Sequence, residues 1–317
     1  MKILNYMPVI GVALFAYIVW NIGIDKIIAS FQQINIFFLL LGIGSAFFIL
    51  FLRAIKFKMV INAHGFDESM FNCFKIWSIG LFTGLITPGR VGDFIKVFYL
   101  DDLQPFGKRL SVVIADRIID LAVVLCSALI GVILLNVWFG YTIISFGLIL
   151  GFVAAFFVGF YIFTRKNSMR KLLKPLFNLF VPGKYKEKLK LDFYGFYDVF
   201  GELKNKKRNL FTITLFNIFI WLFSIMLALF FGLAFGISFN YLFIFAVISV
   251  MVIIELIPVS VSGIGTRETF LLLVLPLVGM SKGMIISFSL VYLVFGYWIT
   301  VPIGLFFWIK TPVKPKI

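Results

Sequence analysis

The chain has 317 residues, of which 62% are hydrophobic and 14% are charged, and its mean hydropathy is +1.08. Soluble globular domains are about 45–50% apolar and about 25% charged, and a water-soluble fold of this length has too little interior to hide so much apolar surface. The 42 Phe, 11 Tyr and 6 Trp exclude a disordered chain. Composition therefore predicts an all-α polytopic membrane protein, with a single integral membrane domain over residues 1–317.

The 29 Lys and Arg against 14 Asp and Glu give a net charge of +15, and the excess is concentrated in one segment. Residues 165–208 hold thirteen Lys and Arg and four Asp and Glu, a net +9. Basic loops mark the cytoplasmic side of a membrane protein, so we expect a cytoplasmic loop here and no nucleic-acid partner. Apolar residues at helical spacing within the loop, at 169–180 and 189–203, predict helices on the anionic inner leaflet, which either anchor the loop or gather lipid headgroups.

Apolar segments of about 20 residues are long enough to cross a bilayer as helices. We predict six full spans, at 3–20, 34–52, 111–135, 141–163, 209–235 and 283–309. Only Lys2 precedes the first segment and no small-residue cleavage site follows it, so we interpret it as a retained span rather than a signal peptide.

Two further apolar segments are interrupted by proline and glycine. Residues 70–100 break at 87–93 (Thr-Pro-Gly-Arg-Val-Gly-Asp), and residues 241–280 break at 258–268. Helices end at such residues, and unwound backbone persists at membrane depth only where protein or water covers it. We therefore predict two re-entrant or broken helical hairpins. The alternative is that both segments are ordinary spans kinked at proline.

The basic residues also predict an orientation. They cluster at 53–58, 165–208 and 310–316, and placing all three clusters inside puts both termini in the cytoplasm. The first hairpin then begins and ends inside, and the second begins and ends outside. Two spans, a hairpin and one span are followed by the same series inverted, with repeat one at about 1–136 and repeat two at about 141–310. This order is typical of an inverted repeat in a cell-membrane transporter.

Ionisable residues lie inside the apolar segments at three places, where each costs a few kcal/mol or more unless it is paired or hydrated. These residues are Arg90, Asp93 and Lys96 in hairpin one, Asp116, Arg117 and Asp120 in the span at 111–135, and Glu255, Arg267 and Glu268 around the second break, with Arg53 and Lys58 placed to extend the cluster. One interpretation is that they only pair with one another and lock the helices together. The other is that they form a substrate site.

Arginine suits bidentate contact with a phosphate, and bare amides near the start of a half-helix favour an anion. The predicted substrate-binding residues are Arg53, Thr87, Pro88, Gly89, Arg90, Gly92, Ser260, Ser262, Gly263, Gly265 and Arg267. The residues predicted to pair charges or relay a proton are Asp93, Lys96, Asp116, Arg117, Asp120, Glu255 and Glu268. We predict no metal site and no cofactor.

Three blocks of the sequence resemble the signature of one membrane family. They are Pro88-Gly89-Arg90-Val91-Gly92-Asp93, Asp116-Arg117-Ile118-Ile119-Asp120, and Pro258 through Glu268. The family pattern is P-G-R-x-G-E, then E-R-x-x-D, then P-x-S-x-G-G-x-G-x-R-E. Asp93 and Asp116 stand where the family has glutamates, and Ser262 stands where it has a glycine. Over nearly its whole length the chain is similar to the lysylphosphatidylglycerol synthase transmembrane-region family, a flippase-like domain.

The resemblance implies transbilayer movement of an anionic phospholipid or a polyprenyl-phosphate-linked lipid, with membrane lipids as partners. Some members carry a synthase domain after this region. Because this chain ends at Ile317, we expect no aminoacylation and no enzyme activity. No G-x-x-x-x-G-K-[ST] loop occurs, so energy would come from a proton or sodium gradient, the membrane potential or consumption of the lipid. The alternatives are a secondary transporter of a small soluble anion, a membrane enzyme acting on a lipid-linked sugar, and a scaffold subunit.

Overall fold

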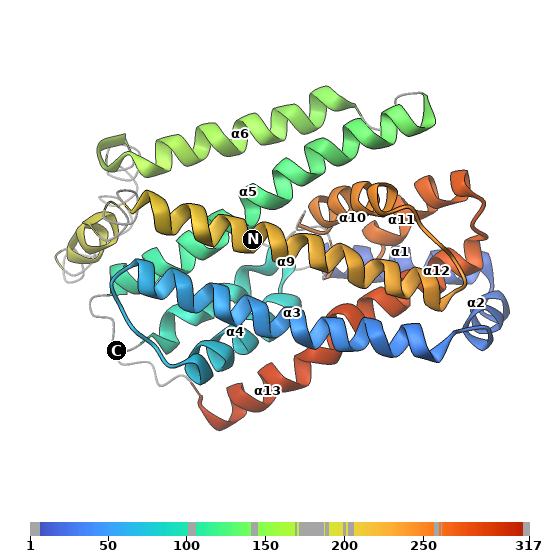
Figure 1. The fold of residues 1–317 in the computed structure, drawn as a ribbon, viewed down its shortest axis with the longest axis horizontal. Coiled ribbons are helices and arrows are strands. Elements are labelled where there is room, and N and C mark those ends of the chain that lie inside the picture. The colour runs from blue at the N-terminus through green and yellow to red at the C-terminus, as the bar shows by residue number, and fades with distance from the viewer. Residues whose placement is uncertain are drawn as a thin grey trace.

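The computed structural model describes residues 7–100, 106–140, 145–168, 190–198, 206–256 and 262–312, together with positions 170, 187, 201 and 260. Every regular element within these residues is a helix, which confirms the all-α class. The longer helices run roughly along the long axis of the molecule (Figure 1). Most of the basic segment 165–208, including the helical pattern predicted at 169–180, lies outside the described residues.

Four helical stretches are long and apolar enough to cross a membrane. They are α3 (Ile36–Ala63), α5 (Phe106–Phe139), α9 (Lys207–Ala234) and the composite stretch Lys282–Lys310, and they confirm four of the predicted spans. The other two predicted spans correspond to α1 (Met7–Ile22) and α6 (Phe146–Thr164). Beyond the positive φ of Gly23, α1 continues as α2 (Ile24–Gln32).

The last of these stretches is not a continuous α-helix, although the sequence predicts one over 283–309. It consists of α12 (Lys282–Val291), a π-helical turn η4 (Tyr292–Tyr297), a 3₁₀ turn η5 (Trp298–Thr300) and α13 (Val301–Lys310). Pro302 has no amide N–H to donate to the carbonyl of Trp298. The helix therefore loosens just before this proline.

Both segments with proline and glycine breaks turn back on themselves. Helix α4 (Met70–Leu85) is followed by the 3₁₀ segment η2 (Pro88–Tyr99), and α10 (Tyr241–Leu256) is followed by α11 (Thr266–Val274) and η3 (Leu275–Val278). Helices α4 and α10 lie toward opposite ends of the molecule (Figure 1). The two breaks meet near the middle, where Ser262 Oγ donates a hydrogen bond of 2.7 Å to the carbonyl of Leu85.

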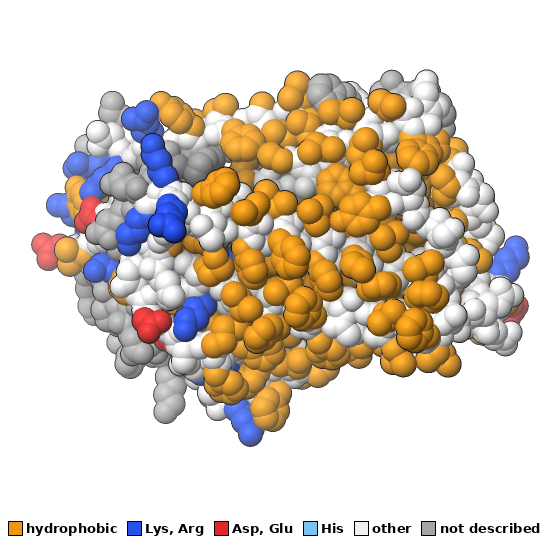
Figure 2. Space-filling model, viewed as in Figure 1, with side chains coloured by type: hydrophobic (Ala, Val, Ile, Leu, Met, Phe, Trp, Pro, Cys, Tyr) orange, Lys and Arg blue, Asp and Glu red, His pale blue; other side chains and the backbone are white. Residues whose placement is uncertain are grey.

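The surface carries a broad apolar belt, and blue Lys and Arg side chains gather at one end of the face drawn in Figure 2. Large apolar side chains on the long helices are well exposed, among them Phe37 at 65%, Val137 at 75% and Phe211 at 70%. Monomeric soluble proteins rarely expose contiguous apolar patches of this kind. Lipid therefore covers the belt, and the chain is a multi-pass membrane protein.

The described part of the basic loop packs on the protein. Phe196 and Tyr197 are buried in the hydrophobic cluster that also holds residues of α3, α4 and α5. The backbone N–H of Gly107, near the start of α5, donates a hydrogen bond of 3.2 Å to Asp192 Oδ1. The prediction that the apolar face of this segment lies on lipid is therefore wrong at Phe196, because α5 and its neighbours cover that side chain.

Candidate functional site

The first break is held by hydroxyl groups that replace the missing helical hydrogen bonds. Thr83 Oγ1 donates to the carbonyl of Gly92 at 2.8 Å, and the N–H of Gly92 donates to Thr87 Oγ1, also at 2.8 Å. A Cβ at position 92 would collide with the carbonyl of Thr83, so only glycine allows η2 to approach α4 this closely. The amide of Gly92 thus has a protein partner, and the prediction that it is bare for an anion is wrong in this conformation.

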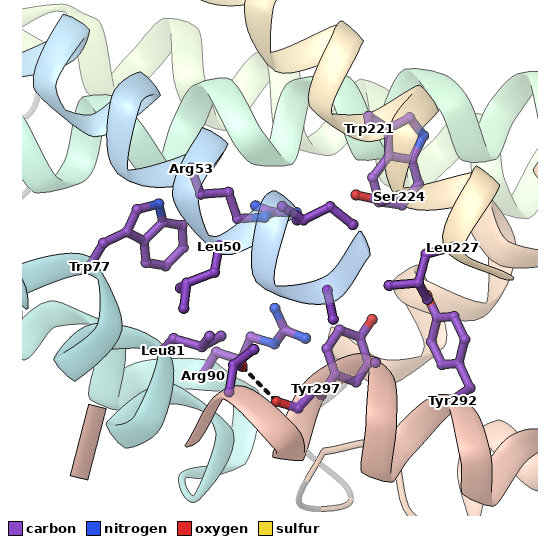
Figure 3. A pocket seen from close by; sticks show the side chains of 14 residues that line it. Leu50, Arg53, Trp77, Leu81, Arg90, Trp221, Ser224, Leu227, Tyr292 and Tyr297 are labelled. Carbon is purple, nitrogen blue, oxygen red and sulfur yellow. Dashed lines mark hydrogen bonds between the residues drawn. The ribbon is translucent and has the colours of Figure 1, made fainter. Parts of the chain in front are cut away.

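Two consecutive left-handed residues turn the chain at this break, Gly89 at φ 61° and Arg90 at φ 56°. Glycine adopts this conformation freely, whereas a side chain such as that of Arg90 pays a strain of about 1–3 kcal/mol, and such residues cluster at functional sites. The turn carries the Arg90 side chain toward the centre of the molecule, where its guanidinium lies 5.3 Å from the centre of the Tyr297 ring (Figure 3).

The second break is closed by a carboxylate. Glu268 Oε2 accepts a hydrogen bond of 2.6 Å from the N–H of Gly265 and so caps the start of α11. At the same break Ser260 Oγ lies 3.2 Å from Thr266 Oγ1. The amide of Gly265 is therefore not free for an anion either, and the prediction that it is bare is wrong in this conformation.

Arg267 is fully enclosed, with no exposed surface, and its partners are protein groups. Its Nη2 lies 2.6 Å from Glu268 Oε1, its Nε donates to Ser289 Oγ at 2.7 Å, and its Nη1 lies 3.5 Å from Glu255 Oε1. Gly263, at φ 73°, allows this packing, because a Cβ there would lie 2.5 Å from Glu255 Cγ. In this conformation Arg267 and its three partners hold α10, α11 and α12 together, and we call this group the brace.

A second set of buried charges joins α3, η2 and α5. Lys56 has no exposed surface and lies 2.8 Å from Asp116 Oδ1 and 2.6 Å from Asp120 Oδ1. Lys96 is equally buried and lies 2.9 Å from Asp93 Oδ1 and 3.4 Å from Asp116 Oδ2. Each of the two lysines is shared between two carboxylates, so positive and negative charges alternate along this set, which we call the ladder. The alternation offsets the free-energy cost of holding these groups away from water.

Two arginines stand at the edges of this ladder. Arg117 Nη1 lies 3.4 Å from Asp93 Oδ2, and Arg53 Nη1 lies 4.0 Å from Asp120 Oδ1, the longest of these contacts. The Arg53 side chain keeps 24% of its surface exposed and the Arg117 side chain 17%. Both guanidinium groups therefore contact the ladder at its edge only and remain accessible from an adjoining space.

That space consists of two adjoining cavities. The first lies between α3, α4, η2, α9 and η4, and Figure 3 shows Arg53 and Arg90 reaching into it from α3 and η2. The second lies between α3, η2, α5, α9 and α10, and Arg117 and Asp120 line it. Arg53, Arg90, Trp221 and Tyr297 line both cavities.

The cavities are lined by arginine and aromatic side chains. Beside the arginines, Trp77 lines the first cavity and Trp221 lines both, while their indole nitrogens are buried in the surrounding protein and have no acceptor in the described part of the chain. Within the described residues the Arg90 guanidinium has no carboxylate within 4.0 Å, and Tyr297 is its partner. Such a site fits a ligand that presents several acceptor oxygens and negative charge, as a phosphate ester does.

The structure thus brings most of the predicted site residues together, in two groups. Arg53, Arg90, Arg117 and Asp120 line the cavities. Arg267 and Glu268 lie in the enclosed brace and line neither cavity. Glu255 bridges the two groups, because Tyr297 Oη donates to its Oε2 at 3.5 Å while its Oε1 faces Arg267.

Sequence reasoning missed several residues of the site. Lys56 was interpreted only as one of the basic residues that mark the cytoplasmic side. A lysine seven residues before the end of a helix as long as α3 is, however, close enough to the middle of the helix for its side chain to reach the protein core. Trp77, Trp221 and Tyr297 carried no signal, because aromatic residues are common throughout this chain. Ser289 was also missed, and a lone serine in an apolar helix would have been a weak signal.

Comparison with known proteins gives a consistent result. A family model described as the lysylphosphatidylglycerol synthase TM region matches residues 8–304. A UPF0104 membrane protein of Pyrococcus horikoshii is 24% identical over 320 residues, which cover 93% of each chain. A second UPF0104 membrane protein, from Methanocaldococcus jannaschii, is 29% identical over 117 residues, or 36% of this chain and 34% of that one.

Proposed function

Since the chain belongs to the lysylphosphatidylglycerol synthase TM region family, we propose that it moves an anionic lipid across the bilayer without changing it chemically. The substrate is a phospholipid or a polyprenyl-phosphate-linked lipid whose phosphate binds Arg53 and Arg90. The tails stay in the lipid around the apolar belt. The single observation that carries the proposal is that both guanidinium groups line one cavity inside a protein whose outer surface carries a broad apolar belt.

The balance of buried charge supports an anionic substrate. The cations of the central region are Arg53, Lys56, Arg90, Lys96, Arg117 and Arg267, and the carboxylates are Asp93, Asp116, Asp120, Glu255 and Glu268. One positive charge is left over, and it is costly at this depth unless an anion or water compensates it. Arg90 is the group without an ion-paired carboxylate among the described residues, so we place the phosphate there, with Arg53 as its second ligand.

The arrangement of the two hairpins supports an inverted repeat with the substrate site at its centre. Helices α4 and α10 lie toward opposite ends of the molecule and the breaks meet at Ser262 and Leu85, as in transporters that bind substrate where broken helices meet. We propose that the end carrying the basic loop is cytoplasmic. A cysteine introduced at Lys282 should then react with an impermeant thiol reagent from outside the cell, and one at Lys206 only from inside. Reaction of both from the same side would refute this topology.

Glu255 is placed to couple substrate binding to the brace. It contacts Tyr297 on the cavity side and Arg267 on the enclosed side. A phosphate that draws Arg90 away from the Tyr297 ring would change the surroundings of this carboxylate. We propose that the carboxylates of the centre exchange partners, or a proton, during the cycle, and that the substrate contact predicted for Arg267 forms only in another conformation.

The proposal is tested in proteoliposomes that contain a fluorescent phosphatidylglycerol. External dithionite bleaches the label in the outer leaflet, and lipid movement makes the remaining label accessible. Wild-type protein should speed the second phase at least tenfold over protein-free vesicles, and Arg90→Ala should remove most of that gain. Arg208→Ala changes an exposed arginine near the start of α9 and serves as the control.

Lipid movement by Arg90→Ala at the wild-type rate, in protein of normal folded yield, would refute the role of Arg90. Wild-type protein that leaves the lipid in place but takes up radiolabelled phosphate would favour the soluble-anion transporter instead.

A further inference from the structure

The two cavities are staggered along the direction in which a lipid headgroup would travel. On α9 the first cavity is lined by Trp221, Ser224 and Leu227, whereas the second is lined by Asn217 and Trp221. With a helical rise of 1.5 Å per residue, the centres of these two sets lie about 7.5 Å apart along the axis. Helix α9 begins at Lys207, so the second cavity lies nearer the end of the molecule that carries the basic loop.

Four side chains line both cavities and therefore lie where the two adjoin. These are Arg53, Arg90, Trp221 and Tyr297. Two are the cations assigned above to the substrate phosphate, and the other two are aromatic. Trp221 is buried on α9, within the regular part of a long helix. Tyr297 is the last residue of the π-helical turn η4, and this difference decides which of the two aromatic rings can move.

A π-helical turn carries one residue more than the α-helix that replaces it, and such turns occur mostly at functional sites. The backbone is irregular on both sides of Tyr297, with φ −119° at the residue itself and the 3₁₀ turn η5 directly after it. A change of η4 toward α-helical pairing would rotate Tyr297 about the helix axis. Helices α12 and α13 keep their packing in this change when the extra residue stays within the irregular stretch 292–300, as it does if the π-helical turn shifts along that stretch.

The contacts that hold the Tyr297 side chain are also weak enough for it to move. Its ring faces the Arg90 guanidinium at 5.3 Å, and its hydroxyl donates to Glu255 at the long distance of 3.5 Å. Its edge-on neighbour is Tyr292, with ring centroids 5.4 Å apart. A cation–π contact of this kind is weaker than the charge-assisted hydrogen bonds that a phosphate offers the same guanidinium.

From these observations we infer that Tyr297 is the gate between the two cavities and that the π-helical turn η4 is its hinge. With the gate closed, the ring covers Arg90 and separates the cavities. A phosphate that binds Arg90 displaces the ring and opens the way past Trp221. The inference rests on the proposed function for what passes the gate, but the barrier itself is a property of the protein and is measurable without any lipid transport.

The test uses a single cysteine as a reporter of the barrier. Cys73 and Cys126 are replaced by alanine, and Ser224, which lines only the first of the two cavities, becomes cysteine. In sealed vesicles of defined orientation, a charged, membrane-impermeant thiol reagent is supplied from the side of the basic loop. In the proposed arrangement, a reagent from that side reaches position 224 by passing from the second cavity to the first.

We expect Tyr297→Leu to speed labelling at least tenfold and Tyr297→Trp to slow it, relative to the parent. Trp298→Leu alters the neighbouring aromatic residue, which lines neither cavity, and should label at the parent rate. Equal labelling in the parent, Tyr297→Leu and Trp298→Leu would overturn the gate. If Tyr297→Leu does not fold, Tyr297→Trp decides, and labelling at or above the parent rate overturns the proposal.

The same variants are then assayed for movement of fluorescent phosphatidylglycerol. Accelerated labelling in Tyr297→Leu without lipid movement by any variant would support the gate and refute lipid translocation. Lipid movement with unchanged labelling would support lipid translocation and refute the gate, so the two failures are distinguishable.

Discussion

Replacing Lys56 by methionine would remove the cation that two buried carboxylates share. The Nζ atom lies within 2.8 Å of both Asp116 and Asp120, and the side chain has no exposed surface. Removing one partner of a buried ion pair costs about 3–5 kcal/mol, because a charge is left without compensation. Lys96 at 3.4 Å from Asp116 and Arg53 at 4.0 Å from Asp120 compensate part of the loss. We therefore expect the free energy of unfolding to fall by about 3 kcal/mol, the low end of that range.

The measurement is reversible unfolding in mixed micelles, followed by tryptophan fluorescence. The control is Lys58→Met on the same helix, where the lysine is 33% exposed and lies 3.9 Å from the largely exposed Asp67. Its loss should cost about 1 kcal/mol or less. Adding Asp120→Asn to Lys56→Met should recover part of the stability, because it removes the carboxylate that keeps only Arg53 at 4.0 Å, while Asp116 still has Lys96 as its partner. A loss below 1 kcal/mol for Lys56→Met, or no recovery in the double variant, would refute this view of the ladder.

Two further substitutions test the second break by the same unfolding assay. Gly263→Ala should destabilise the protein by about 1–3 kcal/mol, because its Cβ would lie 2.5 Å from Glu255 Cγ on a residue with positive φ. The control is Gly44→Ala, whose Cβ would meet nothing within 4 Å and which should not change the stability. Equal effects at the two positions would contradict the packing described. Ser262→Ala removes the hydrogen bond to the carbonyl of Leu85 and should cost about 1 kcal/mol, so an unchanged stability would mean that the two hairpins are not held together there.

The sequence predicts the centre of this molecule well because its signals are local. Proline and glycine inside an apolar segment end a helix wherever the segment lies, and α4 and α10 do end at Leu85 and Leu256. Charges inside apolar segments need partners, and the residues around Asp93, Asp116 and Glu255 have them.

The prediction fails where the outcome depends on neighbours distant in sequence. The amides of Gly92 and Gly265 are occupied by Thr87 and Glu268, and the sequence does not say that these side chains turn back onto the break. The π-helical turn before Pro302 is hidden in the same way, because a proline in a membrane helix is compatible with a simple kink. The burial of Phe196 against α5 depends on how the loop folds back on the bundle.

The most direct test of the central claim is an experimental structure of the protein with a short-chain phosphatidylglycerol bound. We predict density for the phosphate between the guanidinium groups of Arg53 and Arg90, at charge-assisted hydrogen-bond distances of about 2.7–2.9 Å, with the acyl chains reaching the apolar belt. A headgroup bound elsewhere, with Arg90 still beneath the Tyr297 ring and the cavity filled by water alone, would contradict it.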